Sequence, residues 1–280
     1  MEHTSRAGAV ARRAVLEVVD GRRQPRPDSL VSEEPMEIRL VWPGSPARRV
    51  AVVMRTPGHD FELATGFLLS EGVGVVGEAP RTVAYCLDRV LPATQQYNVV
   101  TVTLECRPAI LPATRSTAVS SACGVCGVQT IEEVFAPARK PLKMSSVVDA
   151  GAIPALPEVL REQQRVFAST GSIHAAGIFD FAGRLVVARE DVGRHNCTDK
   201  VLGARQLGAA DYGDDSILCV SGRIGFDIAV KAVAGRIPVI VGVGGPSSLA
   251  VDLATRAGIT VCGFTRGSRY VVYSHGDRLA

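Results

Sequence analysis

The C-terminal part of the chain alternates short apolar runs with amphipathic segments. The runs SILCV, PVIVGVGG and ITVCGF are rich in β-branched residues and lack polar alternation, which is typical of strands buried on both faces. Between them, FDIAVKAVAGR and PSSLAVDLATRAG have apolar residues at helical spacing. Strands that alternate with helices in this way predict a layered α/β unit around a largely buried sheet.

Further elements are expected on both sides of these runs. Upstream we predict a helix over 157–167, a strand over 184–189 and a helix that begins near Arg194 and ends before Gly208. Downstream, RYVVYS is expected to add a closing strand.

The N-terminal part reads as a smaller α+β unit. The strands Glu37–Trp42 and Arg49–Arg55 are separated by a Pro-Gly-Ser-Pro turn, and Tyr97–Glu105 is a third strand. Between them TPGHDFELATGFLLSEG predicts a helix, with Asp60 as its N-cap and Gly72 as its stop. The expected divisions are a flexible segment 1–35, a subdomain 36–111, a mobile loop 112–130 and an α/β domain 131–280.

Composition limits the class of protein. Hydrophobic residues make up 46% and charged residues 21% of the chain, as in ordinary soluble proteins, and the net charge of +3 gives no general reason to expect nucleic acid. The cysteine count is odd, and five of the 7 cysteines lie in apolar runs, which predicts reduced, buried thiols in a cytoplasmic protein. We see no export signal and no apolar run long enough to span a membrane.

Two cysteines, Cys123 and Cys126, lie among small residues in a stretch without helical or strand period. A structural zinc site needs four ligands, and neither a second CxxC nor the H-x-E of zinc deaminases accompanies this pair. A redox pair, a pair without a role and a thiol that carries a group to another molecule remain as interpretations. The small neighbours leave room for a bulky partner to approach the sulfur, which favours the carrier thiol. We expect no metal.

Glycine-containing turns follow two of the predicted buried strands. SGRIG comes after SILCV, and GGPSS comes after VIVGV. Backbone N–H groups in such turns, with the N-terminus of the next helix, can bind an anion, and Arg223 and Arg266 could pair with phosphate. Neither turn matches a Walker or GxGxxG pattern, and glycines also make ordinary tight turns. Two such turns with FTRGSR at a third strand end predict a site for a phosphorylated ligand.

The stretch REDVGRHNCTDK is dense in charge directly after a predicted strand. The side chains that could form a polar site around a titratable imidazole are Glu190, Asp191, His195 and Lys200. The other interpretation is a helix N-terminus capped by Asp191 or Asn196, with Lys200 in solvent; the two are compatible. His59 and His174 follow small turn residues, and structural roles are expected for them.

Several of these blocks together resemble the FdhD/NarQ family of formate dehydrogenase accessory sulfurtransferases. They are CGVCG, TPGHDFELATGFLLSEG, STGSIHAAGIFD, REDVGRHNCTDK and the long segment from SGRIG to PSSLAVDLA. The resemblance extends over nearly the whole chain after residue 35. One difference is Cys197, where the family pattern GRHNxxDK would have alanine.

The resemblance implies a sulfurtransferase with a cytidine-deaminase-like α/β domain and a smaller N-terminal subdomain. Such proteins take persulfide sulfur from a cysteine desulfurase and pass it to the molybdenum of bis(molybdopterin guanine dinucleotide) before this cofactor enters formate dehydrogenase. The implied catalytic residues are Cys123, as persulfide carrier, and its partner Cys126. A homodimer is implied, and guanine nucleotides such as GDP are expected in the cofactor site.

The resemblance also implies that the segment FTRGSR binds the cofactor. Together with residues of the turns and of the charged block, the candidate cofactor-binding residues are Ser221, Gly222, Arg223, Gly244, Gly245, His195, Phe264, Thr265, Arg266, Gly267, Ser268 and Arg269. Two alternative functions are a non-catalytic chaperone for the nucleotide cofactor and a dithiol oxidoreductase.

Overall fold

The apolar runs of the C-terminal part form one mixed six-stranded sheet. The computed structural model describes residues 8–74, 76, 78–86, 93–111 and 141–280. The sheet has the order β12 (Arg269–Ser274), β11 (Thr260–Arg266), β10 (Val239–Gly242), β9 (Ser216–Val220), β7 (His174–Asp180) and β8 (Leu185–Asp191). Strands β9, β10 and β11 are parallel, so their carboxyl ends share one edge of the sheet.

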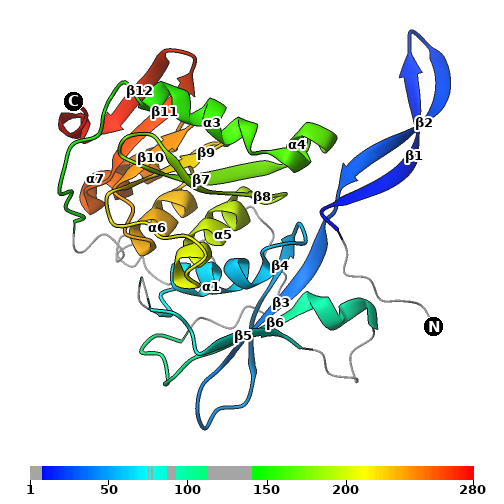
Figure 1. Ribbon diagram of the computed structural model, residues 1–280, viewed down its shortest axis with the longest axis horizontal. Helices are drawn as coiled ribbons and strands as arrows, with labels where there is room; N and C mark the ends of the chain where they lie inside the picture. The colour runs from blue at the N-terminus through cyan, green and yellow to red at the C-terminus, as the bar shows by residue number, and fades with distance from the viewer. Residues whose placement is uncertain (1–7, 75, 77, 87–92, 112–140) are drawn as a thin grey trace.

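Helices cover both faces of this sheet (Figure 1). Because side chains alternate along a strand, Leu218 and Val220 of β9 pack into one core, and Ile217 and Cys219 pack into another. The first core also contains residues of α5 (Arg194–Gln206), α6 (Phe226–Ala234) and α7 (Ser248–Ala257). The second contains residues of η3 (Ile153–Ala155) and α3 (Leu156–Glu162). The C-terminal part is therefore a layered α/β unit, as predicted.

The N-terminal part is a four-stranded sheet with one helix packed on it. The strand order is β4 (Arg48–Arg55), β3 (Glu34–Val41), β6 (Val99–Thr103) and β5 (Thr82–Tyr85). Met36 and Ile38 of β3 form a core with Leu63 and Phe67 of α1 (Asp60–Ser70). The 3-10 helix η1 (Ala93–Asn98) precedes β6. This is the smaller α+β unit expected from the sequence.

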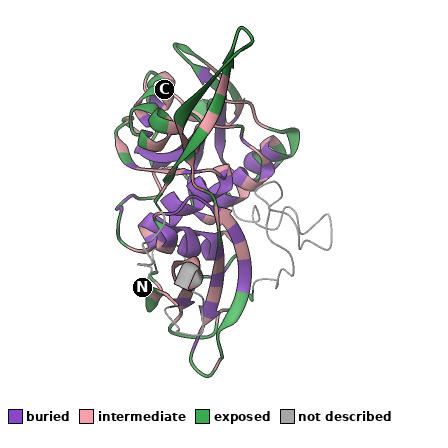
Figure 2. Cartoon of the chain, turned by 90° about the vertical axis from the view of Figure 1, so that its right-hand side faces the viewer, coloured by how far each residue is buried: buried purple, intermediate pink, exposed green. Residues whose placement is uncertain are grey.

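The two parts meet where α1 lies against α5. A Cβ added at Gly66 would lie 1.9 Å from the backbone oxygen of Asp199, and one at Gly203 would lie 1.8 Å from that of Glu62. Only glycine fits at these two positions, so the backbones of the helices are in direct contact. Figure 2 shows this region as almost entirely buried.

An arm of two antiparallel strands, β1 (Val10–Val19) and β2 (Arg22–Val31), extends from the body (Figures 1 and 2). The sequence predicts a flexible segment here and no strand, because RRQPRPDS resembles a linker. The two prolines of this stretch, Pro25 and Pro27, are two positions apart in β2 and therefore on the same side of the strand. Proline has no backbone N–H to donate. On the outer edge of a two-stranded ribbon the backbone faces solvent, so prolines at alternate positions there can be accommodated without loss of hydrogen bonds between the strands.

Most other predicted elements are confirmed, with three corrections. The helix expected over 157–167 is interrupted, and α4 (Arg165–Thr170) follows α3 as a separate helix. Asp60 does not cap α1; His59 occupies that position, and Asp60 binds the buried Arg55 at 3.1 Å. Strand β7 was missed, because its sequence HAAGIFD is rich in alanine and glycine.

The chain ends with η4 (Gly276–Arg278), after β12. Within the described ranges, no helix is both long and apolar enough to cross a membrane.

Candidate ligand site at the strand ends

Three turns meet at the carboxyl edge of the parallel strands. After β9 and β10, the turns are joined by backbone hydrogen bonds from Gly244 N–H to Gly222 O at 3.0 Å and from Ile224 N–H to Gly245 O at 3.2 Å. The backbone N–H of Phe264, in β11, donates to Gly244 O at 3.2 Å. The structure therefore brings together the three stretches that the sequence predicted for a phosphorylated ligand.

At two of these positions a side chain would press against neighbouring groups, which glycine avoids. A Cβ added at Gly245 would lie 2.5 Å from the Phe264 ring, and one at Gly244 would lie 3.0 Å from Arg223. Because glycine has no side chain, the turns pack closely together and their backbone stays near the exposed surface. This is the use of glycine expected where backbone approaches a ligand.

Phe264 is the most unusual residue of this edge. Its φ angle is 52°, in the left-handed region that costs an aromatic residue on the order of 1–3 kcal/mol, and its side chain is 49% exposed. Backbone strain of this kind persists at ligand sites because the surroundings hold the residue in place. Phe264 thus presents an aromatic surface to solvent beside the glycine turns.

Positive charge gathers around Phe264. Arg223, Arg266 and Arg269 are exposed, and none of them makes an ion pair within the described part of the chain. The turn Gly267–Ser268 is also exposed, and Gly267 has φ 58°. Thr265 differs from its neighbours because it is 1% exposed, so its side chain lies inside the protein rather than on this surface.

Helices α6 and α7 begin directly after the turns, and α5 begins after the end of β8. Ser247 caps α7 by accepting a hydrogen bond from Ala250 N–H at 3.3 Å, whereas Gly225 at the start of α6 provides no side-chain cap. The positive ends of these helix dipoles add to the charge of the arginines. The edge is suited to an anion.

His195 lies at the start of α5, and its Nε2 faces Oδ2 of Asp227 at the start of α6. Both side chains are largely buried, and Asp227 lies close to the turn after β9, since a Cβ added at Gly225 would lie 2.5 Å from Asp227 Oδ1. Asp227 was not predicted. The available signal was an acidic residue in the first turn of a helix that follows a glycine turn.

His174, for which a structural role was expected, lies close to the same turn. A Cβ added at Gly222 would lie 3.6 Å from His174 Nδ1 and 3.8 Å from Arg194 Cδ. Burial and the positive charge of Arg194 lower the pKa of His174, and the negative charge of Asp191 opposes this in part. A neutral imidazole therefore borders the arginine-rich edge.

The dense charges of REDVGRHNCTDK are mostly structural. Lys200 is 1% exposed and pairs with Asp191 at 2.6 Å, which corrects the expectation of a solvated lysine. Asp191 also accepts from Thr56 N–H at 3.1 Å, and Glu190 accepts from two backbone N–H groups at the start of α4 at 2.9 Å. The N-cap position of α5 is Gly193 and has no side-chain cap.

The cysteines divide into three groups. Cys197, Cys219 and Cys262 are buried as predicted; burial raises the pKa of Cys197 well above its ordinary value and that of Cys262 to about 12. Cys106 is exposed and Cys86 is half-buried, which corrects the expectation for those two. Cys123 and Cys126 lie outside the described residues, as does the whole predicted loop 112–130. Within the described residues, no cluster of His, Cys, Asp or Glu is suited to a metal ion.

Fold and site define the class as a layered α/β protein with exposed arginines and glycine turns at the carboxyl ends of its parallel strands. The sequence pattern of the FdhD/NarQ family matches residues 31–280, and the chain belongs to this family.

Curated relatives cover nearly all of the chain. It is 45% identical to the sulfur carrier protein FdhD of Streptomyces coelicolor over 96% of this chain and 95% of that protein. It is 44% identical to the protein of the same name from Mycobacterium tuberculosis, over 91% and 92% respectively. A crystal structure of a chain described as a formate dehydrogenase accessory protein, from Desulfotalea psychrophila, has the same fold. Its TM-score is 0.76 at 24% identity, with 97% of this chain and 100% of that chain covered.

Proposed function

We propose that this chain is a sulfur carrier that supports the maturation of formate dehydrogenase. It accepts persulfide sulfur from a cysteine desulfurase and passes it to the molybdenum of bis(molybdopterin guanine dinucleotide). The observation that carries the proposal is the strand-end edge, where exposed arginines that form no ion pair with a described residue surround glycine turns. Membership of the FdhD/NarQ family and relatives named as sulfur carriers support it.

The carrier atom in this proposal is the sulfur of Cys123. Its thiolate attacks the terminal sulfur of the donor's persulfide, a new S–S bond forms, and the donor's cysteine leaves as a thiolate. The product is a Cys123 persulfide. Where Cys126 resolves it, the Cys126 thiolate attacks Cys123 Sγ, a Cys123–Cys126 disulfide forms, and the terminal sulfur leaves as sulfide for molybdenum. In the other role, Cys126 stabilises the Cys123 thiolate, and the molybdenum substrate would supply the two electrons that turn the terminal sulfur into sulfide.

The molybdenum cofactor is the substrate of this transfer, and its nucleotide pyrophosphates are what the edge would bind. Arg223, Arg266 and Arg269 provide forked donors for phosphate oxygens. Backbone N–H groups of the turns and the N-termini of α6 and α7 add further positive potential. Phe264 offers a face on which a guanine base can stack. GDP is therefore the simplest soluble probe of the site.

The partners in this proposal are the desulfurase and formate dehydrogenase, and we expect a homodimer that acts in the cytoplasm. A cofactor chaperone would bind GDP without forming a persulfide at any cysteine. A dithiol oxidoreductase would instead catalyse disulfide reduction, with a measurable redox potential for the Cys123–Cys126 pair.

Intact-mass spectrometry after incubation with a cysteine desulfurase and cysteine tests the sulfur step. The native chain is expected to gain one sulfur atom, and Cys123→Ser is expected to gain none. Cys106→Ser is the matched control, because Cys106 is an exposed thiol that has no part in the proposal. A persulfide that still forms in Cys123→Ser would show that another cysteine carries the sulfur.

A further inference from the structure

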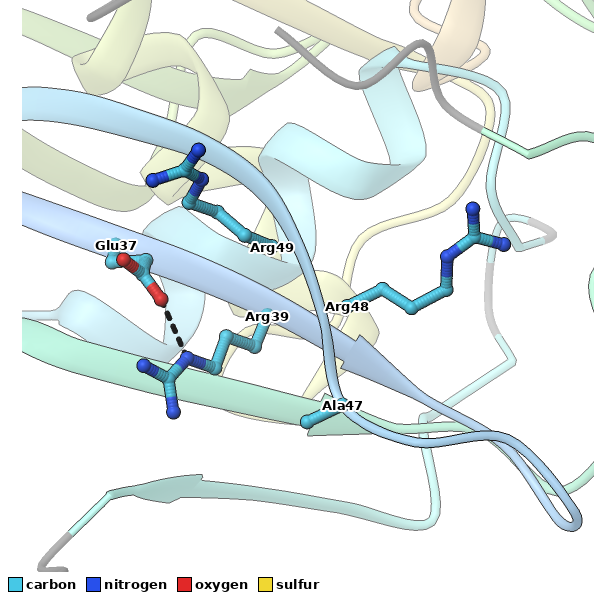
Figure 3. A pocket seen from close by; sticks show the side chains of 5 residues that line it. All are labelled: Glu37, Arg39, Ala47, Arg48 and Arg49. Carbon is cyan, nitrogen blue, oxygen red and sulfur yellow. Dashed lines mark hydrogen bonds and ion pairs between the residues drawn. The ribbon is translucent and has the colours of Figure 1, made fainter. Parts of the chain in front are cut away.

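A second concentration of arginines lies on the smaller sheet, at a hollow on the β3–β4 hairpin (Figure 3). The hollow has a volume of about 580 Å³ and is lined by Glu37, Arg39, Ala47, Arg48 and Arg49. The β3–β4 turn lies at the bottom of Figure 1, whereas β11 and β12 lie near its top, so this hollow is separate from the strand-end site.

The pairing of β3 with β4 places like charges together. A register shift after Ile38 brings Arg39 directly opposite Arg49, and Leu40 opposite Arg48. Two like charges on directly opposed residues of an antiparallel pair destabilise it. A register shift of this type is a local irregularity that aims side chains in a particular direction. Here it places Arg39 and Arg49 on the same face of the hairpin, whereas the neighbouring Arg48 extends in the opposite direction (Figure 3).

The described residues supply only part of the negative charge that these arginines need. Glu37 pairs with Arg39 at 2.5 Å, and Arg39 also donates to Cys86 Sγ at 3.8 Å. Arg48 lies over the Trp42 ring, 5.8 Å from its centroid, and makes no ion pair with any described residue. Arg49 is exposed and makes no ion pair with any described residue. Three arginines against one glutamate leave the hollow with a charge of +2.

The shape and surroundings of the hollow limit what it can bind. It is an exposed depression on a hairpin and not the enclosed, mostly apolar cleft that holds a small ligand. The nearby Trp42 is 8% exposed and cannot stack on a nucleic-acid base, and the whole chain has a net charge of only +3. Carboxylates on an extended segment match paired arginines well, because each guanidinium accepts a carboxylate in a forked geometry.

We propose that the Arg39–Arg48–Arg49 hollow is a docking surface for an acidic segment of a partner protein. The juxtaposed Arg39 and Arg49 bind its aspartate or glutamate side chains, Arg48 adds positive charge from the other face of the hairpin, and Glu37 holds Arg39 in place. This surface is independent of sulfur transfer and of the nucleotide site.

Fluorescence anisotropy with the full-length chain tests this proposal. The probe is a short fluorescein-labelled peptide in which glutamate and serine alternate, and the control peptide has glutamine at each glutamate position. We expect the acidic peptide to bind, the control peptide not to bind, and binding to weaken between about 0.05 M and 0.5 M salt as the charges are screened.

The double variant Arg48→Glu/Arg49→Glu should weaken peptide binding by about tenfold or more, because it replaces two attractions by two repulsions. It keeps charged side chains on the edge strand β4, so edge-to-edge aggregation is not favoured. The double variant Arg22→Glu/Arg23→Glu, on the exposed arm, changes the net charge equally and should bind as the native chain does. Equal thermal unfolding of the two variants confirms that folding is intact.

Three results would overturn the proposal. The first is no binding of the acidic peptide, or equal binding of both peptides. The second is an equal loss in the two double variants, which would indicate attraction to net charge alone. The third is displacement of the peptide by oligodeoxythymidylate or inorganic phosphate at lower charge concentrations than by free acidic peptide.

Discussion

Charged residues are arranged in opposite ways at the α1–α5 junction and at the strand-end edge. At the junction, Lys200 and Asp191 are almost fully buried, and they bind each other and nearby backbone groups. At the edge, Arg223 and Arg266 are exposed without ion pairs among the described residues. The junction therefore satisfies its charges internally, whereas the edge leaves charge available for a ligand.

This difference separates structural charge from functional charge in one chain. Glu62 of α1 and Arg189 of β8 extend the junction across the two parts. Burial, the largest single influence, raises the pKa of Glu62, but the hydrogen bonds and positive charges of Arg189 and His59 together outweigh it, and the pKa is lowered. A dense run of charge such as REDVGRHNCTDK can thus hold two parts of a fold together. The sparser arginines at the strand ends are the better candidates for binding.

Removal of one buried partner at the junction should have the largest effect. Lys200→Met leaves Asp191 as a buried carboxylate without its ion pair, and the Lys200 contacts to Thr56 O at 3.0 Å and Glu190 O at 3.2 Å are also lost. We expect the free energy of unfolding to fall by about 3–5 kcal/mol, measured by urea denaturation. Lys143→Met is the matched control, because Lys143 is exposed. A similar change in both variants would contradict a structural role for the pair.

A smaller but still substantial loss is expected where the helix backbones touch. Gly203→Ala puts a methyl group 1.8 Å from Glu62 O, so α1 and α5 must move apart. We expect a loss of about 1–3 kcal/mol in unfolding free energy, with GDP affinity at the distant edge largely retained. Gly213→Ala is the control, since its nearest neighbour would lie 4.0 Å away. If Gly203→Ala is as stable as the control, the close contact is not rigid.

At the strand-end edge we expect a substitution to lower ligand affinity and to leave stability unchanged. Arg266→Ala should weaken GDP binding by about tenfold, the value of one charge-assisted pair, and leave thermal unfolding unchanged. Isothermal titration calorimetry and differential scanning calorimetry measure the two quantities. Arg81→Ala, another exposed arginine, should change neither. A loss of stability without a loss of affinity would show that Arg266 belongs with the structural charges.

The sequence predicted the edge better than it predicted the junction. Buried β-branched runs and glycine turns are local signals, and parallel strands bring their ends together, so SGRIG, GGPSS and FTRGSR could be placed at one edge in advance. The burial of Lys200 depends on Thr56, which is distant in sequence and belongs to the other part of the chain. No local pattern contains that contact.

The elements and the residue that the sequence did not predict have one physical cause in common. Strand β7 is stabilised by its neighbours β8 and β9, not by the weak propensity of HAAGIFD. In the arm, β1 and β2 pair along their whole length although β2 contains Pro25 and Pro27. Asp227 became a site candidate only when two helix starts were found side by side. In each instance, contacts with other segments of the chain determine the structure, and local sequence preferences do not.

The smallest expected effect concerns His174, which borders the edge but is half-buried. Its pKa is lowered from 6.5 by burial and by Arg194, so the folded chain binds fewer protons than the unfolded chain just below that pH. Stability should therefore decrease as the pH falls from about 7.5 to about 5.5, by less than about 1 kcal/mol from this residue. Urea denaturation at both pH values should show a smaller decrease for His174→Gln than for the native chain. Bound GDP would favour the protonated imidazole through its negative charge, so the native decrease should shrink with GDP present. If stability depends on pH identically in both proteins, His174 has the same pKa in the folded and the unfolded chain. In that case the charges at the strand-end edge do not influence it.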